Sequence, residues 1–212
     1  MKNKLIIIGT GGHAKVVIDI FRRLPKFEIV GLIEREPFLK KFFDLPVIGS
    51  DGDLEKIHKN GINNIFIAVG DNKKRSELAS NVQEIGYSLV NAISPFTQIS
   101  ETVEIGKGIA IMPGAIINPD SSIGDNVIIN TGSTIDHDCL ISKDAHIAPG
   151  CNLAGNVKIG QGVFLGSGCK VIPEISIGAW SNIGAGSVVV KNIPDHCLAF
   201  GVPATVKKTE VR

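Results

Sequence analysis

Aliphatic residues recur at every sixth position through the second half of the chain. From Ile93 to Val189, each of these positions holds Ile, Leu or Val, and the residue four places later is small or β-branched. A period of six fits neither an α-helix, which repeats every 3.6 residues, nor a plain strand, which repeats every two. It is typical of a parallel β-helix of hexapeptide repeats, in which three short strands make each triangular coil of about 18 residues.

In such a coil the aliphatic residue points inward and the small residue lies near a corner. Cys139, Cys151 and Cys169 belong to the small set, so we interpret them as packing residues rather than as metal or redox ligands. We expect an all-β, left-handed β-helix over residues 93–190. A short prism with flat faces tends to bury one face against copies of itself, which predicts a homotrimer around a threefold axis.

The first 92 residues alternate between strand and helix patterns instead. Apolar residues at helical spacing follow His13, and two further helices are expected at 53–59 and 73–86. The expected strands are short apolar runs: Leu5–Ile8, Ile29–Ile33, Ile65–Val69 and Tyr87–Val90. This order predicts a small α/β domain with a parallel sheet, equivalent to half of a Rossmann-like domain.

A glycine-rich turn joins the first expected strand to the first expected helix. Gly9-Thr10-Gly11-Gly12-His13-Ala14 fits the G-x-G-x-x-A pattern, and Glu34 ends the second strand about 20 residues later. The glycines allow a pyrophosphate to approach the helix N-terminus, and the carboxylate can accept a ribose hydroxyl. Since only half of a dinucleotide domain fits in 92 residues, the pattern favours a nucleotide-sugar diphosphate over NAD. A tight turn with no ligand is the alternative.

Two further positions belong to the same expected crevice. Gly70 closes the third strand, and Asn72 follows it at the same edge of the sheet. Arg35 could pair with a phosphate or a base, or it could be an exposed cation with no ligand.

Histidines supply the candidate chemistry of the repeat region. His137 lies between Asp136 and Asp138 and is expected to point outward, and an adjacent carboxylate can orient an imidazole and raise its basicity. This is what a general base requires, although a solvated turn histidine would give the same pattern. His146 is the other histidine of the repeat. A prism-type carbonic anhydrase holds zinc with three histidines, so two predict no metal site.

Charge and composition narrow the function classes. The formal net charge of +1 argues against a broad nucleic-acid surface. No apolar run approaches the ~20 residues that span a bilayer, and the apolar run at Leu5–Ile8 is too short for a signal peptide. The 4 cysteines are then expected to be reduced thiols, which indicates a cytoplasmic protein.

Together, these features resemble the bacterial sugar O-/N-acyltransferases of the sialic-acid O-acetyltransferase type. The likeness is greatest to the nucleotide-linked (UDP-) 4-amino-sugar N-acetyltransferases of bacillosamine and perosamine synthesis. The matching residues are Gly11-Gly12-His13, Asn130, His137-Asp138-Cys139, His146, the segment 154–160 and Gly201-Val202-Pro203-Ala204.

The resemblance implies an acetyl-CoA-dependent N-acetyltransferase without a metal, acting by direct transfer in bacterial glycan synthesis. It implies that His137 is the general base for the sugar amine, that Asp138 orients His137, and that Asn130 lies near the sugar. It implies acetyl-CoA contacts for His146, Gly155, Ser167 and Ala185, with the C-terminal tail 191–212 completing that site. The implied nucleotide-sugar contacts of the α/β domain are Gly11, Gly12, His13, Glu34, Arg35 and Gly70.

Three other functions share the fold. A sugar or sialic acid O-acetyltransferase would use the same His-Asp pair, and a non-catalytic scaffold would bind the nucleotide sugar without acetyl-CoA. A serine acetyltransferase-like activity is disfavoured because the first domain is α/β rather than helical.

Overall fold

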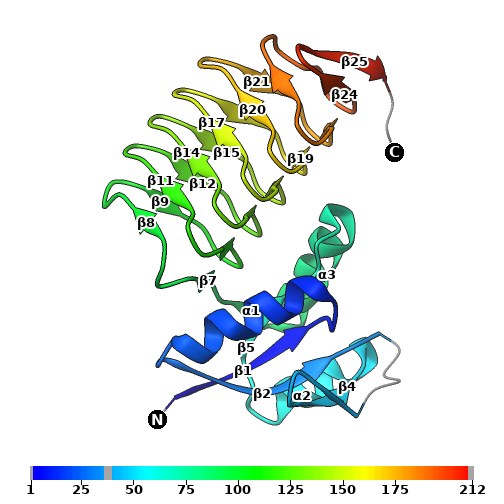
Figure 1. The fold of residues 1–212 in the computed structure, drawn as a ribbon. Helices are drawn as coiled ribbons and strands as arrows, with labels where there is room; N and C mark the ends of the chain where they lie inside the picture. Colours follow the sequence, from blue (N-terminus) through cyan, green and yellow to red (C-terminus); the bar gives the residue numbers. More distant parts are fainter. Residues whose placement is uncertain (1, 36–39, 210–212) are drawn as a thin grey trace. The chain divides into compact units, whose positions relative to one another are not determined.

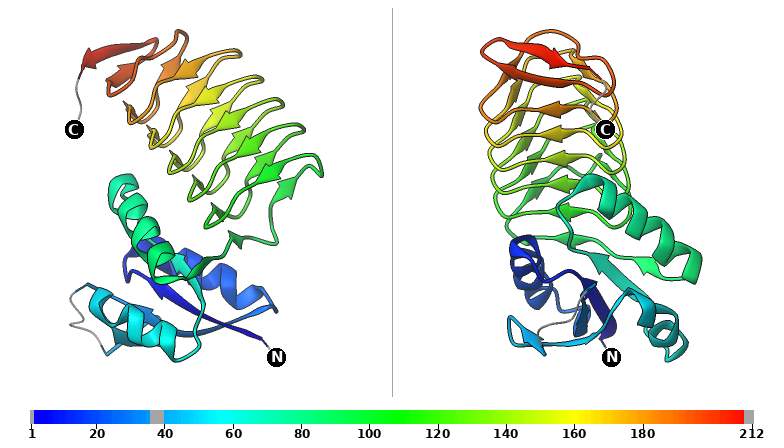
Figure 2. Two further views of the ribbon diagram at one scale, coloured as in Figure 1. Left: turned by 180° about the vertical axis from the view of Figure 1, so that it is seen from behind. Right: turned by 90° about the vertical axis from the view of Figure 1, so that its right-hand side faces the viewer.

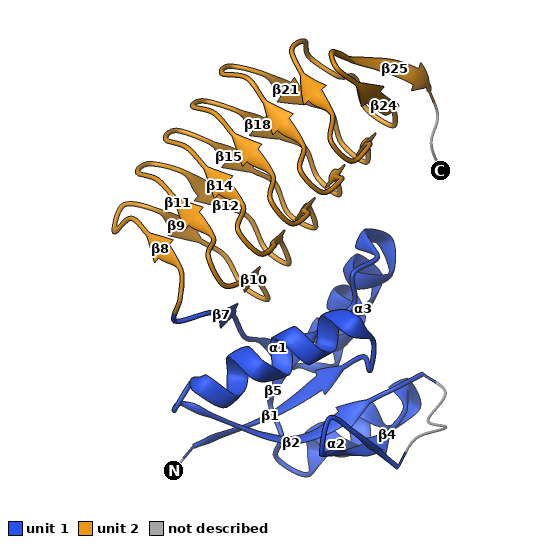
Figure 3. Ribbon diagram, viewed as in Figure 1, with its two compact units in different colours: residues 1–95 blue, residues 96–212 orange. Residues whose placement is uncertain are grey.

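The computed structural model describes residues 2–35 and 40–209. The chain divides into two compact units, residues 1–95 and 96–212 (Figure 3), whereas the sequence placed the boundary after residue 92. The last three residues of the predicted C-terminal tail lie outside the described residues. Within the described part of the chain, no helix is both long and apolar enough to cross a bilayer.

Unit 1 is an α/β sandwich around one sheet with the strand order β3-β4-β2-β1-β5-β6 (Figure 1). Its strands are β1 (Asn3–Ile8), β2 (Phe27–Ile33), β3 (Lys41–Phe42), β4 (Leu45–Gly49), β5 (Asn64–Ile67) and β6 (Ser88–Leu89). Its helices are α1 (Gly12–Arg23), the 3-10 turn η1 (Asp51–Asp53), α2 (Leu54–Lys59) and α3 (Asn72–Ile85).

The four strands predicted from the sequence pair in parallel, as expected, but two further strands that were not predicted make the sheet mixed at one edge. Strands β4, β2, β1, β5 and β6 pair in parallel, but β3 pairs antiparallel with β4. The two residues that join them, Phe43 and Asp44, have φ values of 49° and 64°. Two successive positive φ angles make the tight turn that joins two antiparallel strands. Because the sequence has no glycine at these positions, the turn was not predicted.

Apolar side chains bury both faces of this sheet. On one face α1 packs Phe21 against Phe66 of β5, with ring centroids 5.4 Å apart. On the other face Ile6 and Ile8 of β1 share a cluster with residues of α2 and α3, including Leu54 and Val82. This three-layer arrangement leaves the carboxyl ends of β1, β2 and β5 at one edge of the sheet.

Unit 2 is a parallel β-helix whose coils stack along one axis (Figure 2). One face contains β10 (Ala110–Ile111), β13 (Ile128–Ile129), β16 (His146–Ile147), β19 (Phe164–Leu165), β22 (Asn182–Ile183), β24 (Leu198–Gly201) and β25 (Ala204–Lys208). The second contains β8 (Gln98–Ile99), β11 (Ile116–Ile117), β14 (Thr134–Ile135), β17 (Asn152–Leu153), β20 (Lys170–Val171) and β23 (Val188–Val189). The third contains β9 (Glu104–Ile105), β12 (Ser122–Ile123), β15 (Leu140–Ile141), β18 (Lys158–Ile159) and β21 (Ser176–Ile177), while β7 (Ala92–Ile93) precedes the coils.

The predicted inside and corners of the prism are confirmed. The second residue of each strand in the central coils is buried, as Ile135, Ile141 and Ile147 illustrate. Cys139, Cys151 and Cys169 are buried free thiols, and burial raises the pKa of each. These cysteines are therefore packing residues rather than reactive ones.

The corners differ in the residues that hold the left-handed conformation they require. One corner uses glycine, as at Gly132 and Gly150, with φ values of 66° and 69°. The corner that follows the second face instead uses Asp120, Asp138 and Asn156, with φ values of 60°, 59° and 58°. Short polar side chains tolerate this conformation better than other non-glycine residues do. That corner consequently displays carboxylate and amide groups.

Candidate functional site

His137 and Asp138 lie together at the polar corner, directly after β14. The imidazole Nδ1 of His137 is 2.7 Å from the Asp138 carboxylate Oδ2, and the two side chains are 59% and 60% exposed. The hydrogen bond to Asp138 raises the pKa of His137, and the charges of Asp136 and Asp138 add to the effect. With Nδ1 donating to the carboxylate, Nε2 is left to accept a proton, which is the geometry of a general base.

The backbone of His137 is held from both sides. Its N–H donates to the Asp136 carboxylate at 2.9 Å, and its carbonyl accepts from the Asn156 N–H at 2.9 Å. The same oxygen of Asp136 accepts from the Asn118 side chain, one coil earlier, also at 2.9 Å. The Asn118 hydrogen bond and then the His137 N–H lower the pKa of Asp136. From the sequence, Asp136 was noted only as a neighbour of His137, and Asn118 was missed.

Gly155 lies against the His137 ring. A Cβ atom at Gly155 would be 2.6 Å from Cε1 and 2.7 Å from Nε2 of His137, which is closer than real Cβ contacts come. The residue was expected to line acetyl-CoA, and the structure places its backbone beside the imidazole edge that would take the proton. Any larger residue here would displace that ring.

His146 lies on β16, on a different face from β14. Its side chain is 8% exposed, its Nε2 is 3.2 Å from Nδ2 of Asn130, and its ring packs edge-on against Phe164 at a centroid distance of 5.2 Å. The structure therefore groups Asn130 with His146 rather than with His137.

Ser167 and Ala185 follow the same face as His146, one and two coils further along. The Gly186 N–H donates to the Ser167 carbonyl at 2.9 Å, and a Cβ atom at Gly166 would lie 2.5 Å from the Ala185 nitrogen. The backbones of successive coils thus pack closely along this edge of the prism. Within one chain the expected acetyl-CoA residues His146, Ser167 and Ala185 share a face that His137 does not.

In unit 1, the glycine-rich turn and Glu34 lie at the same edge of the sheet. Thr10 Oγ1 donates to Glu34 Oε2 at 2.5 Å, and the Arg35 N–H donates to Oε1 at 3.1 Å. Gly9 has a φ of 111°, and a Cβ there would lie 2.9 Å from the Ala68 carbonyl oxygen, so the turn requires glycine. Around Gly11 and Gly12 there is open space at the start of α1.

A crevice of about 470 Å³ opens beside this turn. Its apolar part comes from Ile8, Gly9, Val69 and Leu78, and its polar lining is Glu34, Arg35, Asp51, Lys74, Glu77 and Asn81. Glu34 and Arg35 were expected here. The four polar residues from η1 and α3 were missed, and the expected Gly11, Gly12, His13 and Gly70 do not line the crevice.

A buried arginine supports the other wall of this edge. Arg75 is 1% exposed and donates to the carbonyls of Val69 and Gly70 at 3.2 and 3.1 Å, and to the Asn72 side chain at 2.9 Å. It thereby fixes the Gly70 loop. Burial, with the Arg75 charge second, lowers the pKa of His13 to about 4, so His13 is neutral near pH 7. No sequence pattern marked Arg75.

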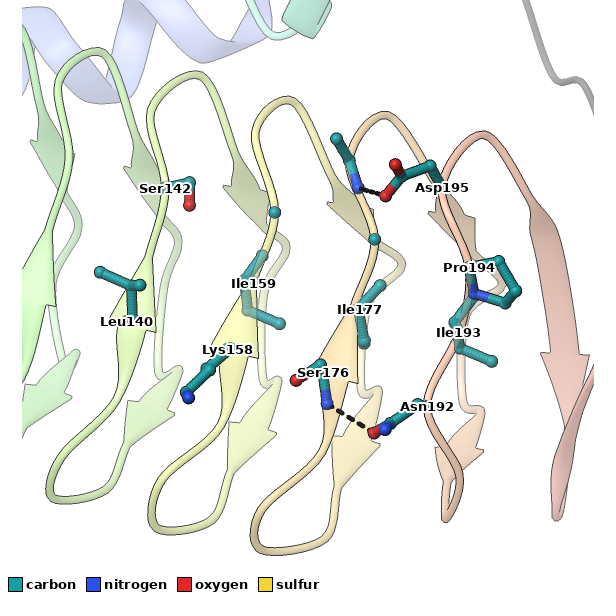
Figure 4. Close-up of a pocket in the computed structure, with 13 residues that line it drawn as sticks. Leu140, Ser142, Lys158, Ile159, Ser176, Ile177, Asn192, Ile193, Pro194 and Asp195 are labelled. Carbon is teal, nitrogen blue, oxygen red and sulfur yellow. Dashed lines mark hydrogen bonds between the residues drawn. The ribbon is translucent and has the colours of Figure 1, made fainter.

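A separate shallow groove of about 450 Å³ runs along the third face of the β-helix (Figure 4). Its polar groups mainly satisfy the backbone: Asn192 accepts from the Ser176 N–H at 2.9 Å, and Asp195 from the Ala179 N–H at 2.7 Å. It contains none of the single site residues predicted from the sequence, although it includes residues 158–160 of the family-matching segment and residues 192–195 of the C-terminal tail. Among the described residues, no group of three or more His, Cys, Asp or Glu side chains could hold a metal ion.

Family models match both units. Residues 4–82 match the PglD N-terminal domain, and residues 102–137, 138–172 and 156–191 match the bacterial transferase hexapeptide repeats. A curated viral protein, uncharacterized protein L142 of Acanthamoeba polyphaga mimivirus, is 36% identical over 102 residues. That match covers 48% of this chain and 20% of the viral protein, so the chain spans about a fifth of that relative.

Solved structures match over nearly the whole chain. PerB from Caulobacter crescentus, in complex with CoA and GDP-perosamine, is 43% identical with a TM-score of 0.93, and 97% of each chain is covered. The acetyltransferase domain of PglB from Neisseria gonorrhoeae, in complex with acetyl coenzyme A, is 33% identical with a TM-score of 0.90. There the match covers 97% of this chain and 100% of that one. These similarities confirm the family predicted from the sequence, and the chain belongs to the PglD-like N-acetyltransferases with hexapeptide repeats.

Proposed function

We propose that this protein transfers the acetyl group of acetyl-CoA to the amine of a nucleotide-linked 4-amino sugar, with His137 as the general base. The hydrogen bond between His137 and Asp138 carries the proposal, because it fixes the tautomer and raises the pKa of an imidazole that is open to solvent. The similar PerB and PglB structures hold CoA with GDP-perosamine and acetyl coenzyme A, respectively.

The chemistry follows from this geometry. Nε2 of His137 accepts a proton from the sugar amine as the amine nitrogen attacks the thioester carbonyl. The new C–N bond forms, the C–S bond breaks, and the proton can pass from the imidazolium to the departing CoA thiolate. The Asp138 carboxylate stabilises the imidazolium in between. A thioester is already activated, so positioning and base catalysis suffice, the latter contributing about 10²–10⁴-fold.

The remaining expected residues divide between the two substrates. His146, Gly155, Ser167, Ala185 and the C-terminal tail are assigned to acetyl-CoA, and Asn130 to the sugar. Gly11, Gly12, His13, Glu34, Arg35 and Gly70 are assigned to the nucleotide sugar. The nucleotide is UDP in the expectation drawn from the sequence, and it is GDP in the similar PerB complex, so both belong in any substrate test.

We also propose a homotrimer. Within one chain, His137 and Gly155 lie at one corner of the prism, whereas His146, Ser167 and Ala185 follow another face. A second copy can bring its acetyl-CoA edge to the first copy's His137 corner, and threefold closure repeats this at every interface. Sedimentation would then give three times the mass of the chain, and a monomer with full activity would contradict this arrangement.

The test is release of the CoA thiol from acetyl-CoA with a panel of acceptors. The panel contains UDP-, GDP- and dTDP-linked 4-amino sugars, free sialic acid and serine. Fast release with a nucleotide-linked amino sugar, lost in His137→Ala, is the expected result. Release only with a sugar hydroxyl would establish O-acetylation instead, and nucleotide-sugar binding without acetyl-CoA binding would indicate a scaffold.

A further inference from the structure

The crevice beside the glycine-rich turn adjoins a second cavity. That cavity, of about 550 Å³, lies between α2 and α3. Asp51, Leu78 and Asn81 line both cavities, and we call the strip of surface that the two cavities share the passage. The passage offers one carboxylate, one amide and one apolar side chain.

The groups along the crevice match the successive parts of a nucleoside diphosphate: the diphosphate, the ribose and the base. A diphosphate belongs at the N-terminus of α1, where the backbone N–H groups and the helix dipole favour an anion. Glu34, at the carboxyl end of β2, is the group for ribose hydroxyls. A base attached to that ribose then lies beyond Glu34 along the crevice, with Ile8, Val69 and Leu78 as apolar contacts. Its polar edge meets Asp51 and Asn81.

These polar groups are available for a ligand. Within the described part of the chain, neither the Asp51 carboxylate nor the Asn81 amide takes part in a hydrogen bond or an ion pair. The neighbouring carboxylates differ: Glu34 accepts from Thr10 and Arg35, and Asp53 accepts from Ser50. Asp51 and Asn81 are both exposed, so the side chains of both are open to a ligand in the crevice.

We propose that this passage recognises guanine, so that the acceptor is a GDP-linked amino sugar; the inference rests on the proposed function. Guanine carries two adjacent donors, N1–H and the N2 amino group, beside the acceptor O6. A carboxylate accepts from two parallel donors, and a side-chain amide can donate to O6. Uracil has one N–H between two carbonyls, so a carboxylate set against that edge would face an oxygen. The crevice and the sequence-based expectation of UDP therefore make opposite predictions.

Calorimetric titration of the full-length protein with GDP, UDP and inosine diphosphate tests this without any turnover. Inosine diphosphate lacks only the N2 amino group. The wild type is expected to bind GDP roughly 10- to 100-fold more tightly than UDP, and about 10-fold more tightly than inosine diphosphate. In Asp51→Asn, GDP affinity is expected to fall to the level of inosine diphosphate while UDP affinity stays unchanged. Glu84→Gln, which alters a carboxylate that lines only the second cavity, is the matched control and should change none of the three.

Each contrary outcome has its own meaning. UDP binding as tight as GDP overturns the guanine assignment and leaves acetyl transfer to a nucleotide-linked amine intact. Unchanged GDP affinity in Asp51→Asn, with thermal unfolding like that of the wild type, overturns the role of Asp51. An equal loss in Glu84→Gln overturns the placement of the base at the passage. Failure of both GDP and UDP to bind would remove the nucleotide from the proposed function as well.

Discussion

The polar corner of the β-helix takes its groups from adjacent residues and from coils 18 residues apart, whereas the crevice of the α/β unit draws on residues from Ile8 to Asn81. At the corner, the repeat itself determines which residues are neighbours. In the crevice, only the packing of α3 and η1 against the sheet brings them together. In the regular β-helix, the candidate catalytic residues can therefore be predicted from the sequence. In the α/β unit, the residues that line the crevice can be identified only from the tertiary structure.

The largest expected effect is on kcat, and it distinguishes catalysis at the polar corner from nucleotide-sugar binding in the α/β unit. His137→Gln removes the base but keeps a polar side chain at the corner, so kcat should fall about 10²–10⁴-fold. The KM for the nucleotide sugar and the Kd for acetyl-CoA should change little, because the α/β unit and the other prism edge are untouched. Steady-state kinetics with calorimetry check this, and a change confined to KM would place His137 in binding instead.

Gly155→Ala tests whether the corner depends on the next coil. The added Cβ would lie 2.6 Å from the His137 ring, so the imidazole must move and kcat should fall roughly 10- to 100-fold, since small misplacements of a reacting group are costly. Gly114→Ala is the control: Gly114 has a φ of 76° and no contact closer than 3.7 Å. It should lower stability by about 1 kcal/mol and leave kcat unchanged. Equal kcat values in Gly155→Ala and the wild type would show that the position of the His137 ring does not depend on a glycine at residue 155.

The pH dependence of kcat/KM sharpens the role of Asp138. His137 must be unprotonated to act as a base, and its pKa is raised by the hydrogen bond to Asp138. Activity is therefore lost as pH falls through that raised pKa. Asp138→Asn removes the charge, so the acidic limb should shift to lower pH while the maximal rate declines. An acidic limb at the same pH in both proteins would mean that another group controls it.

A parallel experiment concerns Asp136, which orients the His137 backbone. Asp136→Asn keeps an oxygen for the His137 N–H, whereas Asp136→Ala removes it. We expect a fall in kcat of about 10-fold in the alanine variant and most of the rate restored in the asparagine variant. Circular dichroism and thermal unfolding serve as controls for the fold. An alanine variant with normal kcat would leave Asp136 without a role in positioning.

The smallest expected effect is in the α/β unit and concerns the pH dependence of folding stability. Burial lowers the pKa of His13 to about 4, below its value in the unfolded chain, so the unfolded state binds the extra proton between these two values. Folding stability should then decrease as pH falls from about 6.5 to 4, by up to about 3 kcal/mol. His13→Gln should flatten this dependence in urea unfolding. A slope identical to that of the wild type would show that His13 titrates normally.

The sequence predicted what its periodicity encodes. The six-residue repeat located the β-helix, the buried cysteines and the outward His137-Asp138 pair, and the glycine-rich turn located the edge of the sheet. The contact between Gly155 and His137 was also within reach, because residues 18 apart stack, but Gly155 was assigned to the cofactor alone.

The rest depends on contacts that no local pattern encodes. Phe43 and Asp44 adopt positive φ angles without glycine, so the β3–β4 hairpin was missed. Arg75 resembles any surface arginine of a helix until the fold buries it. Asp51 and Asn81 come from two elements 30 residues apart, and only the tertiary fold lines them along one crevice.

The central claim is that the β-helix corner acetylates an amine delivered by the nucleotide. Mass spectrometry and NMR of the product formed from acetyl-CoA and a GDP-linked 4-amino sugar test it most directly. The account predicts one acetyl group on the amine nitrogen with the wild type and almost no product with His137→Gln. Acetylation of a hydroxyl, or the same N-acetyl product at the wild-type rate from His137→Gln, would contradict it.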